Sequence, residues 1–273
     1  MMTLRRFLIG LLFLFSVFSL RAQSKFSDNE KSLGTLFESL KKASTDSVKQ
    51  EISLRIMHGL KSTLKKKGSF NYPFNSLQNL GKITSSDQTL RVYSWNCVFE
   101  NGDYCYYALI QKKNGRKYDL YELRHDLEQE DSMVKKLSAS KWLGALYYQI
   151  VPFKHKNRNL YLLLGWDGNK GRTSKKVIET LGFSKSGDPV LGFQVINWRG
   201  KRLSRVIFEY SDQAQMKLKY HKKTNTLVFD HLSPSEPRYI NQFEYYGPDF
   251  SYDALEFKDG FWNLVEEFDT KSL

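Results

Sequence analysis

From Leu90 to the C-terminus, short apolar segments alternate with short turns, and this spacing constrains the fold more than any other feature of the chain. Two of the turns, Asn101-Gly102 and Asp259-Gly260, carry dipeptides typical of tight β-hairpins. Parallel strands need a connection of about a dozen residues or more, and only the interval 126–137 offers that room. The pattern therefore predicts an antiparallel sheet, sandwich or incomplete barrel.

Strands are expected over 91–95, 104–110, 118–123, 143–151, 160–166, 176–183, 189–196, 203–210, 216–220, 226–229, 254–257 and 261–265. The polar interval 126–137 is expected to form a short helix or a loop. Segment 233–248 contains Pro234, Pro237 and Pro248, and we expect a long loop there.

Residues 28–67 predict two helices ahead of the strands, because their apolar residues recur at helical spacing. The two apolar stripes are Leu33, Leu36, Phe37 and Leu40, followed by Val48, Ile52, Ile56, Leu60 and Leu64. Cations and a glycine at 65–68 are expected to end the second helix. The fold class is therefore α+β, with a helical hairpin over 23–70 and an antiparallel β-rich domain over 71–273. The hairpin either stands alone or packs on the strands as one domain.

The first residues predict a secretory signal peptide over 1–22. Arg5 and Arg6 precede an apolar run of about 12 residues, and the segment ends at Ala22. Crossing a bilayer takes about 20 apolar residues, so this run is too short for an anchor. Cleavage is expected after Ala22 or after Ser19. We expect an exported, periplasmic or extracellular protein whose mature chain has no membrane span.

The charge balance favours an anionic partner without identifying one. The chain carries a net charge of +13, and removal of Arg5, Arg6 and Arg21 with the signal peptide lowers it to +10. A basic exported protein is attracted to anionic envelope polymers, although a lysine-rich surface also simply keeps a protein soluble. The lysines are scattered, with one run at 65–67. The expected partners are an anionic envelope polymer or another envelope protein, and nucleic acid is not expected.

The only two cysteines, Cys97 and Cys105, flank the Asn101-Gly102 turn. A three-residue loop over 100–102, with Gly102 left-handed, places the two cysteines directly opposite each other, whereas a two-residue loop does not. Cross-strand Cβ atoms lie about 4.5–5.5 Å apart, which is slightly wide for a disulfide. Because export permits oxidation, we predict a structural disulfide, the alternative being two separate thiols.

Catalytic and metal-binding motifs are largely missing from the sequence. The 5 histidines include no pair at the spacing of a helical zinc site, and the chain has no phosphate-binding glycine loop or dinucleotide fingerprint. We therefore predict no cofactor and no metal site. Acidic residues from Asp249 to Glu267 lie among aromatic residues, which leaves open a carboxylate-based glycan hydrolase. The alternative is that these acids and rings are the polar and apolar faces of two strands.

Several stretches resemble a group of signal-peptide-bearing hypothetical proteins of Bacteroidota. The resemblance rests on 90–95, 161–168, 229–234 and 246–253 and spans roughly residues 90–265. It implies a cell-envelope or extracellular setting and no catalytic activity. Loops that do more than connect often carry function, so we place candidate binding residues in or beside the longest loop and the 166–169 turn. These candidates are Trp166, Asp167, Asp230, His231, Asp249 and Asp253.

The sequence thus predicts an exported, non-enzymatic protein that binds a partner or ligand in the cell envelope or outside the cell. The alternative is a hydrolase of envelope glycan. It requires two carboxyl groups about 5–10 Å apart in one pocket.

Overall fold

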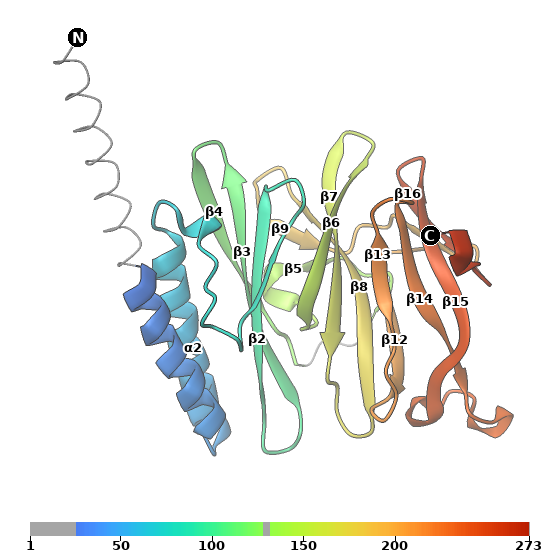
Figure 1. The fold of residues 1–273 in the computed structure, drawn as a ribbon, viewed down its shortest axis with the longest axis horizontal. Helices are drawn as coiled ribbons and strands as arrows, with labels where there is room; N and C mark the ends of the chain where they lie inside the picture. Colours follow the sequence, from blue (N-terminus) through green and yellow to red (C-terminus); the bar gives the residue numbers. More distant parts are fainter. Residues whose placement is uncertain (1–25, 128–131, 273) are drawn as a thin grey trace, which may run out of the picture. The chain divides into compact units, whose positions relative to one another are not determined.

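The computed structural model describes residues 26–127 and 132–272, so the predicted signal peptide lies outside the described residues. The chain divides into two compact units, with the boundary between Asn79 and Leu80. The first unit contains a helix over 26–42, α2 (Asp46–Leu64) and the short 3-10 helix η1 (Ser69–Asn71) (Figure 1). This confirms the predicted helical pair. No helix within the described residues is long and apolar enough to cross a membrane.

Helix α2 forms where its apolar residues recur every four positions. Ile52, Ile56, Leu60 and Leu64 are buried and form the inner face of the helix, whereas Val48, the first residue of the predicted stripe, is 42% exposed. The helix ends before Gly68, whose φ of 90° is a left-handed conformation that suits glycine.

The second unit consists of strands and short 3-10 helices. The strands are β1 (Gly81–Thr84), β2 (Leu90–Val98), β3 (Tyr104–Asn114), β4 (Lys117–Arg124), β5 (Leu137–Ser138), β6 (Leu146–His155), β7 (Arg158–Asp167), β8 (Thr173–Phe183), β9 (Pro189–Leu191), β10 (Ile196–Trp198), β11 (Lys201–Leu203), β12 (Arg205–Ser211), β13 (Leu218–His221), β14 (Thr226–Pro234), β15 (Tyr246–Lys258) and β16 (Phe261–Val265). The 3-10 helices are η2 (Ala139–Lys141), η3 (Pro237–Tyr239), η4 (Phe243–Tyr245) and η5 (Thr270–Ser272).

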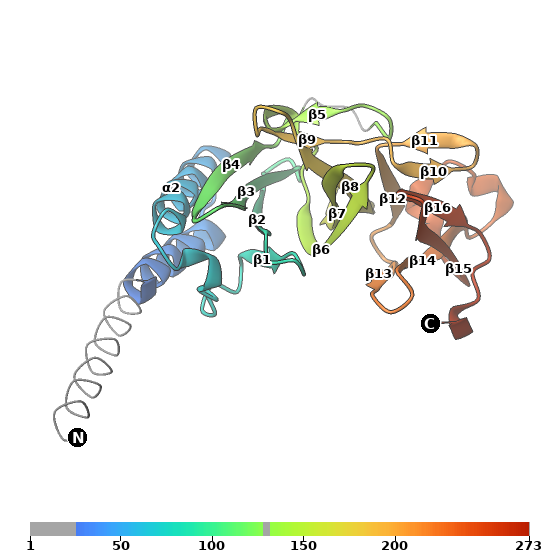
Figure 2. The ribbon, with the colours of Figure 1, turned by 90° about the horizontal axis from the view of Figure 1, so that it is seen from above.

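These strands form three sheets. The first has the order β1-β2-β3-β4, the central one β5-β9-β8-β7-β6 with β12 also on β8, and the third β11-β10-β16-β15-β14-β13. The pairings are antiparallel, as predicted, apart from the parallel pair β10 and β16. Figures 1 and 2 show the three groups of strands following one another across the second unit.

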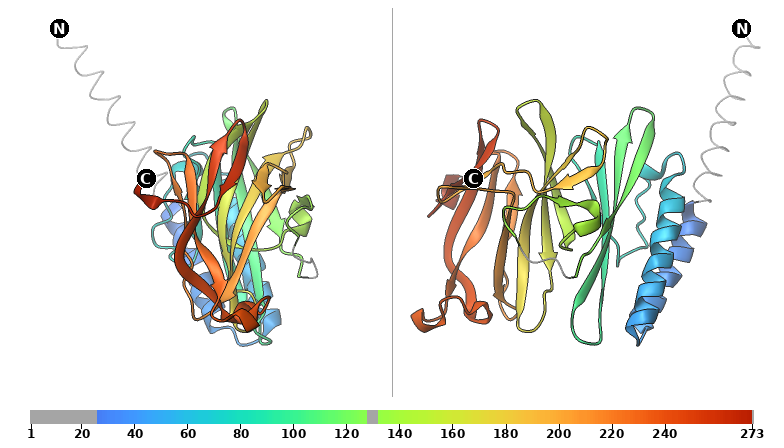
Figure 3. Two further views of the ribbon diagram at one scale, coloured as in Figure 1. Left: turned by 90° about the vertical axis from the view of Figure 1, so that its right-hand side faces the viewer. Right: turned by 180° about the vertical axis from the view of Figure 1, so that it is seen from behind.

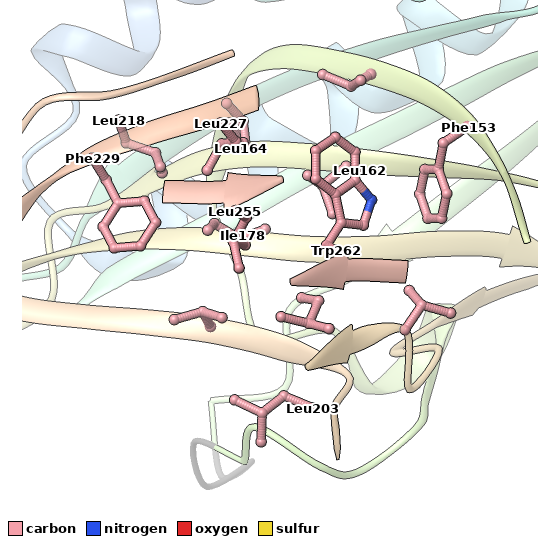
Figure 4. Packing of buried hydrophobic residues seen from close by; sticks show 14 of the residues in the cluster. Phe153, Leu162, Leu164, Ile178, Leu203, Leu218, Leu227, Phe229, Leu255 and Trp262 are labelled. Carbon is pink, nitrogen blue, oxygen red and sulfur yellow. The ribbon is translucent and has the colours of Figure 1, made fainter. Parts of the chain in front are cut away.

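The central sheet is buried on both faces, which explains the unbroken apolar run in β7. Leu160, Leu162 and Leu164 point into a core shared with the third sheet, while Tyr161 and Leu163 point into a core shared with the first. Figure 4 shows the former core, where Leu162 and Leu164 lie close to Trp262 and Leu227 of the third sheet. A strand buried on both faces loses the usual alternation of polar and apolar residues. The second unit is therefore a β-sandwich of three layers, which the view from behind in Figure 3 also shows.

Several predicted boundaries were wrong. The expected strand over 203–210 is two strands, because β11 ends at Leu203 and β12 begins at Arg205. Segment 233–248 is not one long loop, because β14 continues to Pro234 and β15 already begins at Tyr246. Pro248 fits in β15 because β16 pairs only with residues 254–258, which leaves an unpaired edge beside the proline. The expected strand over 189–196 is interrupted at Gly192, whose φ is 95°. A Cβ atom there would lie 2.6 Å from the carbonyl oxygen of Lys135, so only glycine fits.

The predicted register of the cysteine hairpin is confirmed, but the predicted disulfide is wrong. Gly102 has a φ of 85° and Cys97 lies directly opposite Cys105, yet no disulfide joins them. Phe99 N–H donates to the carbonyl of Asp103 at 2.8 Å, so Phe99 and Asp103 form a hydrogen-bonded pair. Because hydrogen-bonded and non-hydrogen-bonded pairs alternate along antiparallel strands, Cys97 and Cys105, two residues further along, also form a hydrogen-bonded pair. Cβ atoms in such pairs lie at the wide end of the range of about 4.5–5.5 Å, beyond the 3.5–4.5 Å that a disulfide needs. Hydrogen bonding with Cys97 instead lowers the pKa of Cys105 to about 5, in spite of burial.

A buried ion pair fixes the segment after residue 131 to the central sheet. Arg205 on β12 and Glu179 on β8 lie opposite each other, and Arg205 Nε donates to Glu179 Oε1 at 2.9 Å. Arg205 Nη1 also donates to the carbonyl oxygens of Ser132 and Lys135. Both charged side chains are almost fully buried. Burial raises the pKa of Glu179 to about 7, against the opposing charge of Arg205.

Candidate functional site

A groove of about 520 Å³ lies between the central and third sheets, and we name it the cationic groove. It is lined by Tyr148, Gln149, Lys176, Met216, Lys217, Leu218, Lys219, His221, Val228, Phe229, Asp230, Tyr252 and Thr270. These residues come from β6 and β8 of the central sheet, from the β13, β14 and β15 region of the third, and from η5. The groove therefore depends on the packing of two sheets.

The floor of the cationic groove is formed by buried apolar residues. Met216, Leu218 and Phe229 belong to the core between the two sheets. Tyr148 crosses the groove, where its hydroxyl donates to the carbonyl oxygen of Leu218 at 3.3 Å. Gln149 accepts a hydrogen bond from the backbone N–H of Tyr220, also on the third sheet. These two cross-sheet bonds hold the groove walls at a fixed separation.

The walls of the cationic groove carry unpaired cations. Within the described residues, none of Lys176, Lys217 and Lys219 forms an ion pair. The Lys176 ammonium lies over the Tyr148 ring, 4.5 Å from its centroid, and burial lowers the pKa of Lys176. Burial, followed by the charge of Lys219, lowers the pKa of His221. Three lysines gathered beside a single carboxylate, Asp230, are available to an anionic ligand.

Asp230 is the one predicted site residue that lines the cationic groove. It is buried, and its Oδ2 accepts a hydrogen bond from the backbone N–H of Lys217 at 2.7 Å. The Asp230 N–H donates in turn to the Lys217 carbonyl oxygen. Its carboxylate therefore positions the start of β13, and with it the groove lysines.

Three further predicted residues gather around the β14–β15 pair. His231 Nδ1 lies 2.8 Å from Asp253 Oδ2, and Asp253 Oδ1 accepts the backbone N–H of Glu267. Asp249 Oδ1 accepts two hydrogen bonds from Ser251, through its N–H and its hydroxyl. Burial acts to raise the pKa of Asp249, but these bonds and the charge of His231 outweigh it and lower the pKa. This group ties the bulged part of β15 to its neighbours.

Asp167 lies in a second hollow, the polar cleft, of about 290 Å³. Its Oδ1 accepts the hydroxyl of Tyr106 and the N–H of Asn169, each at 2.8 Å. The Tyr106 hydroxyl in turn accepts the Gly168 N–H. Asp103, also in the cleft, pairs with Lys170 at 3.0 Å. The polar groups of the cleft satisfy one another, in contrast to those of the cationic groove.

The six predicted residues therefore do not form one site. Trp166, beside Asp167, packs its ring edge-to-face against Tyr104 with centroids 5.7 Å apart. No three His, Cys, Asp or Glu side chains of the described residues are grouped so as to hold a metal ion. Asp230 is the sole carboxylate lining the cationic groove, so the two-acid geometry that a glycan hydrolase needs is not found there.

Sequence reasoning missed the groove lysines, because it considered only contiguous runs of charge. Residues 217–221 alternate Lys, Leu, Lys, Tyr and His, which places three cations on one face of a strand. That alternation could have revealed the shared cationic face from the sequence. The contribution of Lys176, about 40 residues earlier in the sequence, had no local signal.

The arrangement can bind an anion that carries an apolar body, since cations surround a floor of buried apolar residues. No family model, curated protein or solved structure matches this chain.

Proposed function

We propose that this protein is an exported, non-enzymatic binding protein of the cell envelope or the extracellular space. Its ligand is an anionic envelope molecule with an apolar portion, held in the cationic groove. The observation that carries the proposal is the gathering of Lys176, Lys217 and Lys219 without an ion-pair partner in the described residues. Lys217 and Lys219 are exposed, whereas Lys176 is half-buried. Half-buried charges in proteins are normally paired, so the unpaired Lys176 ammonium beside a groove, with two further cations next to it, favours an anionic ligand as the partner.

The apolar lining of the groove favours a ligand that has an apolar portion as well as a charged group. A purely ionic partner would gain nothing from the apolar lining of the groove, whereas an apolar body gains about 25 cal/mol for each Å² of its own surface that the groove removes from water. Tyr148 and Tyr252 add aromatic walls. Only an amphipathic anion contacts both the cations and the apolar residues of the groove.

Export rests on the signal-peptide pattern and on the resemblance to signal-peptide-bearing proteins. Expression of the whole chain in a bacterium, followed by fractionation and mass measurement, tests it. We expect the protein outside the cytoplasm with Gln23 as its first residue, or Leu20 if cleavage follows Ser19. An intact N-terminus in the cytoplasmic fraction contradicts export.

Ligand binding is tested with two fluorescent probes of similar apolar structure. Anilinonaphthalene sulfonate carries a negative charge and N-phenylnaphthylamine carries none. We expect the sulfonate to bind about tenfold more tightly or better, since each tenfold is about 1.4 kcal/mol and a charge-assisted contact supplies that much. Equal affinity for both probes contradicts the proposal.

A matched pair of variants locates the site. Lys217→Glu/Lys219→Glu reverses two groove cations, whereas Lys222→Glu/Lys223→Glu makes the same charge change in the adjacent exposed turn. We expect the first double variant to lose sulfonate binding and the second to keep most of it. Equal losses in both indicate only a general effect of net charge.

A further inference from the structure

The segment between β14 and the middle of β15, residues 235–250, exposes an unusual amount of apolar surface, and we name it the aromatic loop. Phe250 is 94% exposed, Ile240 61% and Phe243 40%. Large exposed apolar side chains gathered in one segment mark interaction surfaces more often than isolated ones do. The loop also contains Arg238, Tyr239 and Tyr245, residue types enriched at interface hot spots.

The aromatic loop is internally ordered. Tyr239 stacks on Tyr245 with ring centroids 3.9 Å apart, and Phe243 packs against Tyr246. Tyr246 also accepts the backbone N–H of Asn241, while Ser235 N–H donates to the Tyr245 carbonyl oxygen. A loop that is ordered before it meets a partner loses little conformational entropy on binding.

Phe250 is held outward by a strained backbone. Its φ of 71° is rare for a bulky residue, and it lies at a register shift where extra β15 residues oppose β14. Asp249 stabilises this bulge by accepting the N–H and hydroxyl of Ser251. Strain of this kind persists where the surrounding structure enforces it, and it clusters at functional positions.

The charge of the aromatic loop is opposite to that of the rest of the chain. Glu236, Glu244 and Asp249 oppose the single cation Arg238, so the segment carries −2 within a strongly basic protein. An anionic membrane surface would repel it. A cationic, partly apolar protein surface is the complementary partner, and the cationic groove has that chemistry.

We propose that the aromatic loop of one molecule docks in the cationic groove of a second copy, with Phe250 against the groove's aromatic lining, Tyr148 and Tyr252, and the loop carboxylates facing Lys217 and Lys219. The inference rests on the proposed function of the groove as a site for apolar anions. Because loop and groove are different surfaces, the contact is head-to-tail and can continue beyond a dimer. A soluble anion in the groove then competes with assembly.

Sedimentation velocity over a range of protein concentrations tests this assembly. We expect the mature protein to associate and Phe250→Asn to weaken association about thirtyfold or more, the loss typical of a hot-spot aromatic residue. Asparagine tolerates positive φ, so this variant removes the ring and keeps the backbone. Lys217→Glu/Lys219→Glu should also be monomeric, while Lys222→Glu/Lys223→Glu should associate.

Mixing the two monomeric variants gives the sharpest result. The Phe250→Asn chain keeps its groove and the groove variant keeps its loop, so an equimolar mixture should form a heterodimer and nothing larger. A monomeric unmutated protein, or variants that fail to pair, overturns the inference. If the unmutated protein is monomeric but still binds the sulfonate probe in the groove, the proposed function stands alone. A further outcome is that the unmutated protein binds lipid vesicles without self-associating and that Phe250→Asn loses this vesicle binding. The loop would then contact a membrane, and the inference would be overturned.

Discussion

The two faces of strand β8 carry charged side chains in opposite settings. Lys175 lines the polar cleft and lies 4.0 Å from Glu209 on the neighbouring strand, and Glu179 on the same face pairs with Arg205. Lys176, the next residue after Lys175, lines the cationic groove with no ion-pair partner in the described residues. Consecutive residues in a strand point to opposite faces, so adjacent lysines belong to different environments.

This difference separates charges that hold the fold from charges that, in our proposal, bind a ligand. On the cleft face, each charge meets an opposite charge from the same chain, so its removal should cost stability. On the groove face, the cations contribute little to the fold, so their removal should cost binding. The following predictions test that division, beginning with the largest effect.

Arg205→Met should destabilise the protein by about 3–5 kcal/mol, because it leaves a buried carboxylate without its partner. Burial raises the pKa of Glu179 from 4.5 to about 7, so its contribution to stability is fully present below 4.5 and is lost as pH rises to about 7. Without the opposing charge of Arg205 this loss grows. Urea denaturation should show a larger deficit at pH 8 than at pH 5.

The matched control is Arg199→Met, which removes an exposed pair with Glu266 of similar length. Exposed pairs contribute about 0–1 kcal/mol, so its effect should be small at both pH values. Equal losses in the two variants would contradict the special role of the buried pair.

Tyr106→Phe should destabilise the protein by about 1–3 kcal/mol, because the Gly168 N–H loses its acceptor and Asp167 loses a donor. Sulfonate binding should stay unchanged, because the polar cleft and the cationic groove share no lining residue. Denaturation and probe titration on the same sample check both parts. A loss of probe affinity in this variant would show that the polar cleft and the cationic groove are energetically coupled, and would contradict the division between the two faces.

Lys176→Met should reduce sulfonate binding and leave stability intact, the reverse of Tyr106→Phe. Methionine keeps the packing over Tyr148 but removes a half-buried, unpaired charge, so stability should stay the same or rise slightly. Sulfonate affinity should fall about tenfold, or about 1.4 kcal/mol. A marked loss of stability would show that Lys176 is a structural residue like Lys175.

The pH dependence of binding gives the smallest expected effect. Because burial lowers the pKa of His221, its imidazole is neutral at pH 7.5 and gains charge below the ordinary value of 6.5. Sulfonate affinity should therefore rise about threefold between pH 7.5 and 5.5, a modest gain for an added cation. His221→Gln should flatten that slope, and an unchanged slope would exclude His221 as the titrating group.

Much of the fold was predictable because its signals are local. Of the two loop lengths that the Asn101-Gly102 turn allowed, the three-residue loop placed Cys97 opposite Cys105, since hairpin register follows from loop length. The disulfide was not predictable in the same way, because it depends on Cβ geometry at a hydrogen-bonded pair. Among the predicted site residues, Asp230 alone lines the cationic groove, and its carboxylate accepts a backbone hydrogen bond.

The sequence by itself determined the helical pair and the antiparallel strands, because each depends on periodicity within about ten residues. Only the tertiary structure decided where charges are paired. Glu179 meets Arg205, and Lys176 meets Tyr148 beside Lys217, through the pairing and packing of sheets whose strands lie far apart in the sequence. Whether a charge is satisfied depends on neighbours within a few ångströms, and no local pattern specifies those neighbours.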